Sequence, residues 1–239
     1  IVWETNKTSW SVSPERLEFT MIPGKVTHLN AEASYSKHLF PIAKPVLTMQ
    51  TDSGEAQGDG LIIIPAYKEI KIHPMLVRPD IDGLFHENQL AGMHRRDDMI
   101  EYSGKGPAKI KTEFSMGIYG DQLYIAIVNY EPDMHKLVLK DFERDGPVWG
   151  DNCNEIFIQL EGELQYFQFI VGVGGHVYDG RSGGLASSWD SDFKSAVHRG
   201  IDRWTTEVLI PLDIFERKVK SRDRIRMNIV RNNPIHGEL

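Results

Sequence analysis

Short stretches in which apolar and polar residues alternate run along much of the chain. The clearest lies at Lys109–Ile118, where every second position from Ile110 onward is apolar or threonine and the positions between are polar. A period of two is typical of a strand with one buried face. A turn at Tyr119–Gln122 and a second apolar stretch at Leu123–Tyr130 complete a predicted antiparallel hairpin.

Other segments have the same character and are separated by turn-forming residues rather than by helical patterns. They lie at 16–20, 26–33, 46–50, 60–64, 69–73, 154–160, 165–173, 203–210 and 224–230. Because strands and helices do not alternate, the pattern favours an all-β protein. The prolines after His73 and Arg78 interrupt regular structure, so we expect a linker there. We predict an immunoglobulin-like sandwich at 1–75 and a larger antiparallel β-sandwich at 76–239.

Composition excludes several classes of function. The 239 residues are 41% hydrophobic and 26% charged, with a net charge of −7. An acidic chain is a poor partner for nucleic acid, and no apolar run approaches the roughly 18 residues of a membrane span. The single cysteine, Cys153, rules out an internal disulfide. The chain starts at Ile1, so we expect it to be part of a longer protein with further domains.

One motif invites an enzymatic interpretation. Gly180–Gly184 matches the G-x-S-x-G pattern of a serine nucleophile. That chemistry needs a buried strand before the serine and a helix after it, and the residues that follow Ser182 have no helical period. We therefore expect no catalytic residues.

A tryptophan and a glutamate close together point to another function. Trp149 lies in a Gly- and Pro-rich segment, and Glu155 follows six residues later, near the start of a predicted strand. An indole can stack on the apolar face of a sugar ring, and a carboxylate can accept hydrogen bonds from neighbouring hydroxyls. The alternative is that Trp149 is a core residue and Glu155 a solvated strand residue.

Several motifs occur in an order that resembles family 9 carbohydrate-binding modules and the related DOMON-like domains. The resemblance covers about 76–239. The matching segments are Ile81–Gly83, Asp121–Ala126, Trp149–Ile158, Tyr166–Phe169, Trp204–Pro211 and Arg226–Arg231.

The resemblance implies a β-sandwich that binds sugars, classically at chain ends and between two aromatic side chains. Trp149 matches one of these aromatic residues and Glu155 the carboxylate that binds hydroxyls. The arginine implied on the next strand is replaced by Ile170, and Tyr166 and Gln168 on the same strand can substitute for it.

The resemblance also implies a second tryptophan after the strand that contains Arg231, but the sequence ends at Leu239 before that segment. Trp189 is a candidate replacement, and Asn228 and Arg231 are candidate hydrogen-bonding residues. The loop around Trp189 can supply oxygens to a structural calcium, through Asp190 and Asp192, as in relatives. No other cofactor is expected.

We therefore expect a non-catalytic module that binds an oligosaccharide or polysaccharide as an accessory part of a larger secreted or surface protein. Its location would be extracellular, cell-surface or periplasmic. One alternative is a structural or interaction spacer whose sugar site has decayed. Another is a haem-binding DOMON-like domain, with axial ligands drawn from Met116 or Met134 and His135 or His176.

Overall fold

The computed structural model describes most of the chain, with gaps. The described residues are 2–4, 10–20, 22, 24–25, 28–35, 42–51, 54–59, 62–63, 69–101, 106–137, 139–182 and 189–237. They divide into two compact units: a first unit of 1–69 with 100–107, and a second unit of 70–99 with 108–239. No helix among the described residues has the length and hydropathy of a membrane-spanning segment.

The first unit is built from antiparallel strands. They are β1 (Val2–Glu4), β4 (Ile42–Thr51), β5 (Gly54–Asp59) and β6 (Ile62–Ile63) in one sheet, and β2 (Trp10–Ser13) with β3 (Glu32–Tyr35) in another. The expected strand at 46–50 lies within β4. Residues 17–20 form no strand, and parts of 26–33 and 60–64 lie outside the described residues. An immunoglobulin-like arrangement of this unit stays a prediction.

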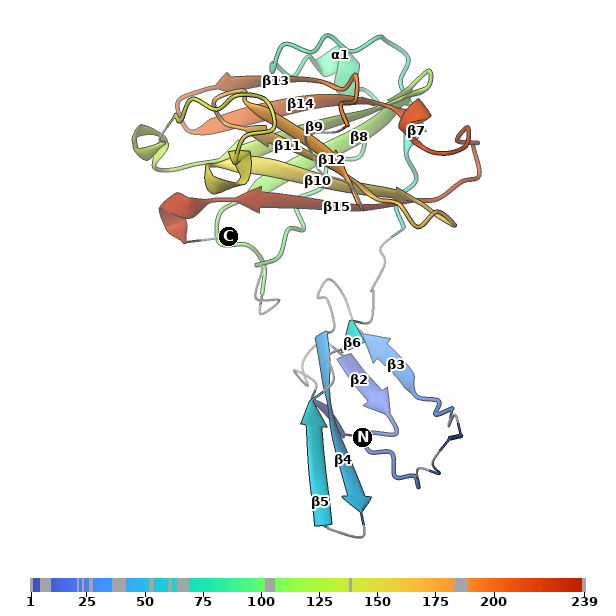
Figure 1. Ribbon diagram of the computed structural model, residues 1–239. Helices are drawn as coiled ribbons and strands as arrows, with labels where there is room; N and C mark the ends of the chain where they lie inside the picture. Colours follow the sequence, from blue (N-terminus) through green and yellow to red (C-terminus); the bar gives the residue numbers. More distant parts are fainter. Residues whose placement is uncertain are drawn as a thin grey trace. The chain divides into compact units, whose positions relative to one another are not determined.

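The second unit is a sandwich of two sheets that lie face to face (Figure 1). The β9 sheet contains, in order, β13 (Lys194–Arg199), β14 (Arg203–Pro211), β9 (Gln122–Tyr130), β8 (Thr112–Tyr119) and β7 (His73–Pro74). The β10 sheet contains β12 (Val177–Arg181), β11 (Phe167–Gly172), β10 (Cys153–Leu160) and β15 (Ile225–Asn232). All pairs are antiparallel except β7 with β8. The all-β sandwich expected from the sequence is confirmed.

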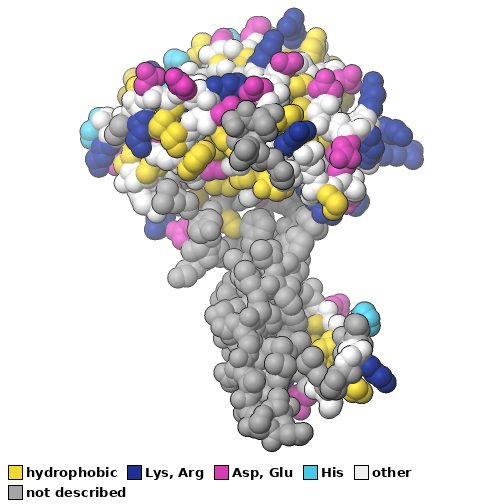
Figure 2. Space-filling view, viewed as in Figure 1, with side chains coloured by type: hydrophobic (Ala, Val, Ile, Leu, Met, Phe, Trp, Pro, Cys, Tyr) yellow, Lys and Arg dark blue, Asp and Glu magenta, His cyan; other side chains and the backbone are white. Residues whose placement is uncertain are grey.

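Short helical turns connect the strands. They are α1 (Glu87–Leu90), η1 (Met134–Lys136), η2 (Val148–Gly150), η4 (Leu212–Ile214) and η5 (Pro234–His236). The space-filling view of this unit shows charged side chains of both signs spread between hydrophobic ones (Figure 2).

The alternating residues of the strands build the core between the two sheets. Every second side chain of β9, β10 and β11 points into it, including Ile125, Ile156 and Phe169, all of which are fully buried. Each such side chain contributes about 1.5–3 kcal/mol when it leaves water. The residues between them point outward, and the two outer faces differ in what lies over them.

The outer face of the β9 sheet is covered by residues 75–93 of the same unit, and we call it the covered face. Met75, Phe85 and Leu90 pack on Tyr124 and on other buried residues of β9 and β14. Figure 1 shows α1 on this side of the sheet. This covering segment shields Tyr124, Ala126 and Leu209 from solvent.

Gly83 brings the covering segment against the sheet. Its φ is +82°, a conformation that favours glycine, and an added Cβ would lie 2.6 Å from the backbone nitrogen of His198. Its N–H donates to Oε2 of Glu207 at 2.8 Å, and the N–H of Asp82 donates to the same oxygen at 3.1 Å. The hydroxyl of Tyr124 also donates to Glu207.

Three of the motifs that resemble family 9 therefore meet in one buried hydrogen-bond network. Ile81–Gly83 supplies backbone donors, Asp121–Ala126 supplies the Tyr124 hydroxyl, and Trp204–Pro211 supplies the fully buried acceptor, Glu207. Burial raises the pKa of Glu207, against the effect of these donors. The motifs serve the architecture of the covered face, and the candidate sugar residues lie elsewhere.

Candidate functional site

The outer face of the β10 sheet carries the candidate site, and we call it the open face. Trp149 reaches it from η2, because the neighbouring Val148 is fully buried and anchors the turn against Cys153 and Ile170. The indole remains 48% exposed. Its ring meets that of Tyr178 edge-on, with centroids 5.6 Å apart and planes at 89°. Trp149 is thus an accessible loop residue held by a neighbouring ring.

Glu155 lies beside this aromatic pair, at an outward position of β10. Its Oε2 accepts a hydrogen bond from Nε2 of Gln168 at 2.7 Å, and its Oε1 accepts one from Nδ2 of Asn232. Among the described residues no cation forms an ion pair with it. The two amides therefore orient the carboxylate without neutralising its charge, and a carboxylate has further lone pairs for incoming hydroxyls.

Asn232 is a site residue that the sequence analysis missed. Its Nδ2 also lies 3.3 Å from the backbone oxygen of Trp149, which ties the tryptophan turn to β15. The signal was available, because positions 228, 230 and 232 share one face of a strand. The register pairs Asn232 with Cys153 and Asn228 with Phe157, so both asparagines lie on the open face.

Tyr178 was missed as well. It pairs with Ile170 in the register of β11 and β12, and its ring lies over Gly180. Burial raises the pKa of Tyr178. Neighbouring acidic groups, Asp145 most of all, raise it further. Its hydroxyl therefore stays protonated at neutral pH and can donate a hydrogen bond.

A second pair of aromatic rings lies further along the open face. Tyr166 is 45% exposed, and its ring centroid lies 6.3 Å from that of Phe157. Asn228 is exposed on the neighbouring strand. The face thus brings together five of the seven predicted residues: Trp149, Glu155, Tyr166, Gln168 and Asn228.

The structure does not bring Arg231 to this group. Arg231 lies on the inner side of β15, where Nη2 forms an ion pair with Glu131 at 2.9 Å and Nη1 donates to Oγ1 of Thr112 at 3.1 Å. Positions 228 and 231 differ by three residues, so they point to opposite faces of a strand. Arg231 stabilises the sandwich instead of lining the open face.

Trp189 also lies away from the open face. It packs against the hydrophobic core, with its ring centroid 5.1 Å from that of Phe167 and 6.4 Å from that of Phe169. Both phenylalanines point to the inner side of β11. Trp189 is therefore a core side chain in this structure, not a second aromatic wall beside Trp149.

Ile170 occupies the position at which the resemblance implies an arginine. It is fully buried with Val148 and Cys153, and Phe142 and Tyr178 pack against them. The same burial raises the pKa of the Cys153 thiol to about 12, so it stays protonated. An arginine at position 170 would leave its charge in this apolar cluster.

The predicted calcium residues separate in the structure. The carboxylates of Asp190, Asp145 and Asp179 lie within 4.8 Å of one another, whereas Asp192 is exposed and not part of this group. The guanidinium of Arg144 already binds Asp190, at 2.9 Å, and also Asp179. A cationic side chain therefore occupies the centre of this acidic cluster, and the described residues do not fit a calcium ion there.

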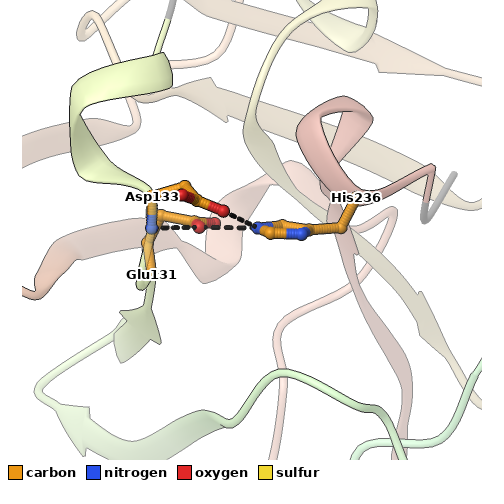
Figure 3. Close-up of side chains that lie close together, drawn as sticks. All are labelled: Glu131, Asp133 and His236. Atoms are coloured by element: carbon orange, nitrogen blue, oxygen red, sulfur yellow. Dashed lines mark hydrogen bonds and ion pairs between the residues drawn. The ribbon is translucent and has the colours of Figure 1, made fainter.

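A second group of potential ligands joins the C-terminal turn to the end of β9. Nε2 of His236 lies 2.8 Å from Oε1 of Glu131 and 3.6 Å from Oδ2 of Asp133 (Figure 3). Glu131 is also bound by Arg231 and, at 3.0 Å, by Nδ2 of Asn233. These contacts satisfy the hydrogen-bonding capacity of the buried Glu131 carboxylate, so the group stabilises the packing of the C-terminal turn against the end of β9.

A hollow of about 350 Å³ lies on the other sheet, near the end of the covered face. Its ionic side chains are paired with one another or with neighbours: Arg203 binds Asp202 at 2.7 Å, and Lys111 binds Glu113 at 2.6 Å. Neither Trp149 nor Glu155 lines it. The open face is therefore the better candidate for sugar binding, because the described residues that line the hollow include neither an exposed tryptophan nor an unpaired carboxylate.

The residues named for haem or serine chemistry are dispersed. Met116 packs against the core, Met134 and His135 lie in η1, and His176 packs edge-on against Phe142. The N–H of Ser182 donates to the backbone oxygen of Tyr166, and its hydroxyl accepts a hydrogen bond from the Tyr166 N–H at 3.0 Å. Ser182 thus extends the pairing of β11 with β12.

Comparison with known proteins identifies the fold. No family model matches the chain, and no curated protein matches it. Its structure is similar to a protein of Bacteroides uniformis ATCC 8492 assigned as carbohydrate-binding, with a TM-score of 0.54 and 16% identity over 68% of this chain and 82% of that chain. It is also similar to a family 9 carbohydrate-binding module of Caldicellulosiruptor kristjanssonii in complex with glucose, with a TM-score of 0.50 and 14% identity over 68% and 78%. The chain has a fold like that of family 9, as its motifs predicted.

Proposed function

We propose that the second unit binds carbohydrate on its open face and has no catalytic role of its own. The observation that carries the proposal is the carboxylate of Glu155, fixed by the amides of Gln168 and Asn232 beside the half-exposed ring of Trp149. A flat apolar surface next to an oriented, un-neutralised acceptor suits a sugar ring, which has an apolar face and a rim of hydroxyls.

The amides hold the Glu155 carboxylate in an orientation in which it can accept hydrogen bonds from hydroxyls. Because Gln168 and Asn232 each occupy one oxygen of Glu155, the carboxylate does not need to reorganise when a sugar arrives. The Tyr178 hydroxyl, which stays protonated at neutral pH, adds a donor beside the ring of Trp149. Binding by this single module would be modest in strength, since small polar ligands lose hydration on binding.

The structural neighbours support this proposal. One of them is a carbohydrate-binding module in complex with glucose, and another is assigned to carbohydrate binding. We further propose that the chain is an accessory part of a longer secreted or surface protein and acts outside the cytoplasm, where polysaccharides are found.

A glycan array followed by calorimetric titration tests the proposal. The wild-type protein is expected to bind at least one class of glycan, and Trp149→Ala is expected to lose about tenfold to a hundredfold in affinity, because about 1.5–3 kcal/mol of burial energy is removed. Ile201→Ala is the matched control, since Ile201 is 97% exposed on the turn between β13 and β14. A blank array, or equal binding by Trp149→Ala, would contradict the proposal.

One observation favours a second candidate, a spacer domain whose sugar site has decayed. Ile170 is a fully buried apolar residue at the position where the family resemblance implies a sugar-binding arginine. A spacer would give a blank array and no heat of binding in the titration, with the wild type as well as with Trp149→Ala. The same experiment therefore separates the two candidates.

A further inference from the structure

We propose that the open face binds a run of at least three linked sugars, with Trp149 and Tyr166 supporting different rings of the chain. This inference rests on the proposed function and goes beyond it, because it assigns the ligand a minimum length and the face a second subsite. The observation behind it is the pair of rings of Phe157 and Tyr166, separate from the pair of Trp149 and Tyr178.

The strand register gives the separation of Tyr166 from the level of Trp149. Ile170 of β11 lies between Tyr178 of β12 and Glu155 of β10, so the Trp149 pair belongs to this level of the sheet. Tyr166 precedes Ile170 by four residues, which is about 13 Å along a strand at about 3.3 Å per residue. One pyranose ring cannot contact both ends, whereas an oligosaccharide lying along the strands can.

The level between Tyr166 and Ile170 carries polar groups beside the ring of Phe157, which lies opposite Gln168 in the register. Gln168 lies midway between Tyr166 and Ile170 on β11 and is bonded to Glu155. Its register partner on β12 is Gly180, and the hydroxyl of Tyr178 lies over that glycine. The exposed rings of Trp149 and Tyr166 thus lie at either end of a stretch that carries an amide and a hydroxyl, an arrangement that suits successive sugar rings and the hydroxyls between them.

The exposure of Tyr166 supports a role in binding. A half-exposed tyrosine presents a rigid ring at small conformational cost, and the ring of Phe157 holds it from below. Asn228 is the register partner of Phe157 and is exposed beside it, so an amide is available at this second subsite too. The second subsite therefore repeats the composition of the first: a supported ring next to a polar side chain.

Calorimetric titration of the whole chain with paired ligands tests the inference. The ligands are the monosaccharide and the linear tetrasaccharide of the gluco-, xylo-, manno- and galacto- series. In the series that binds, the tetrasaccharide is expected to bind at least about tenfold more tightly than the monosaccharide, a difference of about 1.4 kcal/mol. Tyr166→Ala is expected to abolish that gain and leave monosaccharide affinity within about twofold of wild type.

Two matched variants control for unrelated effects. Tyr166→Phe keeps the ring and is expected to keep most of the gain with length. Leu164→Ala removes an exposed apolar side chain, 97% exposed, from the same turn, and is expected to change neither affinity.

The outcomes separate the inference from the function on which it rests. Equal affinity for monosaccharide and tetrasaccharide, with binding lost in Trp149→Ala, overturns the inference and leaves carbohydrate binding intact. A Tyr166→Ala variant that loses monosaccharide binding to the same extent also overturns it, because the two rings would then belong to one subsite. Absence of binding in all four series and on the array overturns the proposed function itself.

Discussion

The covered face and the open face of the same sandwich each contain a hydrogen-bonded glutamate, but only the one on the open face is accessible to solvent. On the covered face, Glu207 is fully buried and receives hydrogen bonds from Gly83, Tyr124 and other groups of the same unit. On the open face, Glu155 receives two amide hydrogen bonds and remains partly accessible.

The difference indicates how to separate structural from functional polar groups. A carboxylate whose partners all come from buried parts of the chain contributes to folding, because removing it leaves those partners unsatisfied. A carboxylate that is oriented by neighbours but still reachable by solvent can bind something else. The motifs that resemble family 9 include residues of both kinds.

Exchanging the two carboxylates for alanine is the strongest test of this contrast. Glu207→Ala is expected to lower the free energy of unfolding by at least about 3 kcal/mol, because it leaves several buried donors without an acceptor. Glu155→Ala is expected to cost less, about 1 kcal/mol in stability, because it leaves only the buried amide of Asn232 and the partly exposed amide of Gln168 without this acceptor, and to abolish glycan binding. Urea unfolding and glycan titration of both variants measure the two effects.

Equal destabilisation by the two substitutions would contradict the difference in role between Glu207 and Glu155. It would mean that Glu155 is as structural as Glu207. Retention of glycan binding by Glu155→Ala would remove the carboxylate from the proposed site.

A third carboxylate, that of Glu131, is buried and contacts Arg231 and His236, so its effect on stability should depend on pH. Burial would raise its pKa, but the hydrogen bonds from His236, the Asp133 N–H and Asn233, with the charge of Arg231, outweigh burial and lower the pKa below its ordinary value of 4.5. A lowered pKa in the folded state gives stability that is present above about pH 4.5 and is lost as the pH falls through the folded value.

Unfolding measured across acidic pH checks this expectation. Glu131→Gln is expected to be less stable than wild type at pH 7 by about 1–3 kcal/mol, with the difference shrinking as the pH falls below about 4.5. A constant difference at all pH values would show that the charge of Glu131 contributes nothing and that only its shape matters.

The smallest expected effect comes from Gly180, which lies opposite Gln168 on the open face and has no side chain of its own. A Cβ at this position would lie 2.9 Å from the hydroxyl oxygen of Tyr178, so Gly180→Ala should displace that ring and weaken glycan binding about threefold, with a stability change within about 0.5 kcal/mol. In a Tyr178→Ala background the same substitution should have no effect on affinity, since the ring is gone. An unchanged loss in that background would contradict the mechanism.

Much of the second unit could be predicted from alternation alone. The expected strands at 110–118, 123–130, 154–160 and 203–210 overlap β8, β9, β10 and β14, because their apolar residues point into one core. β12 and β13 were not predicted. β12 contains the buried Asp179 and Gly180, and β13 lies at the edge of its sheet with partly exposed side chains, so neither has a clear apolar period.

The candidate site was harder to predict than the fold. Trp149 and Glu155 could be found because a tryptophan in a turn lies six residues before a glutamate at the start of a strand, and Gln168 because it lies on the next strand. Asn232 and Tyr178 depend on the register between strands, which alternation within one strand does not determine. The prediction for Arg231 overlooked that it lies three positions after Asn228, so in a strand the two side chains point to opposite faces.

NMR titration can locate the surface on which the sugar binds, which we propose to be the open face. A labelled protein is titrated with the soluble tetrasaccharide that binds best, and the backbone, indole and side-chain amide signals are followed. We expect chemical shift changes at the Trp149 indole and at the side-chain amides of Gln168 and Asn232. We expect none around the hollow that Arg95 and His198 line on the other sheet. Chemical shift changes confined to that hollow, with the Trp149 signals unchanged, would contradict sugar binding on the open face.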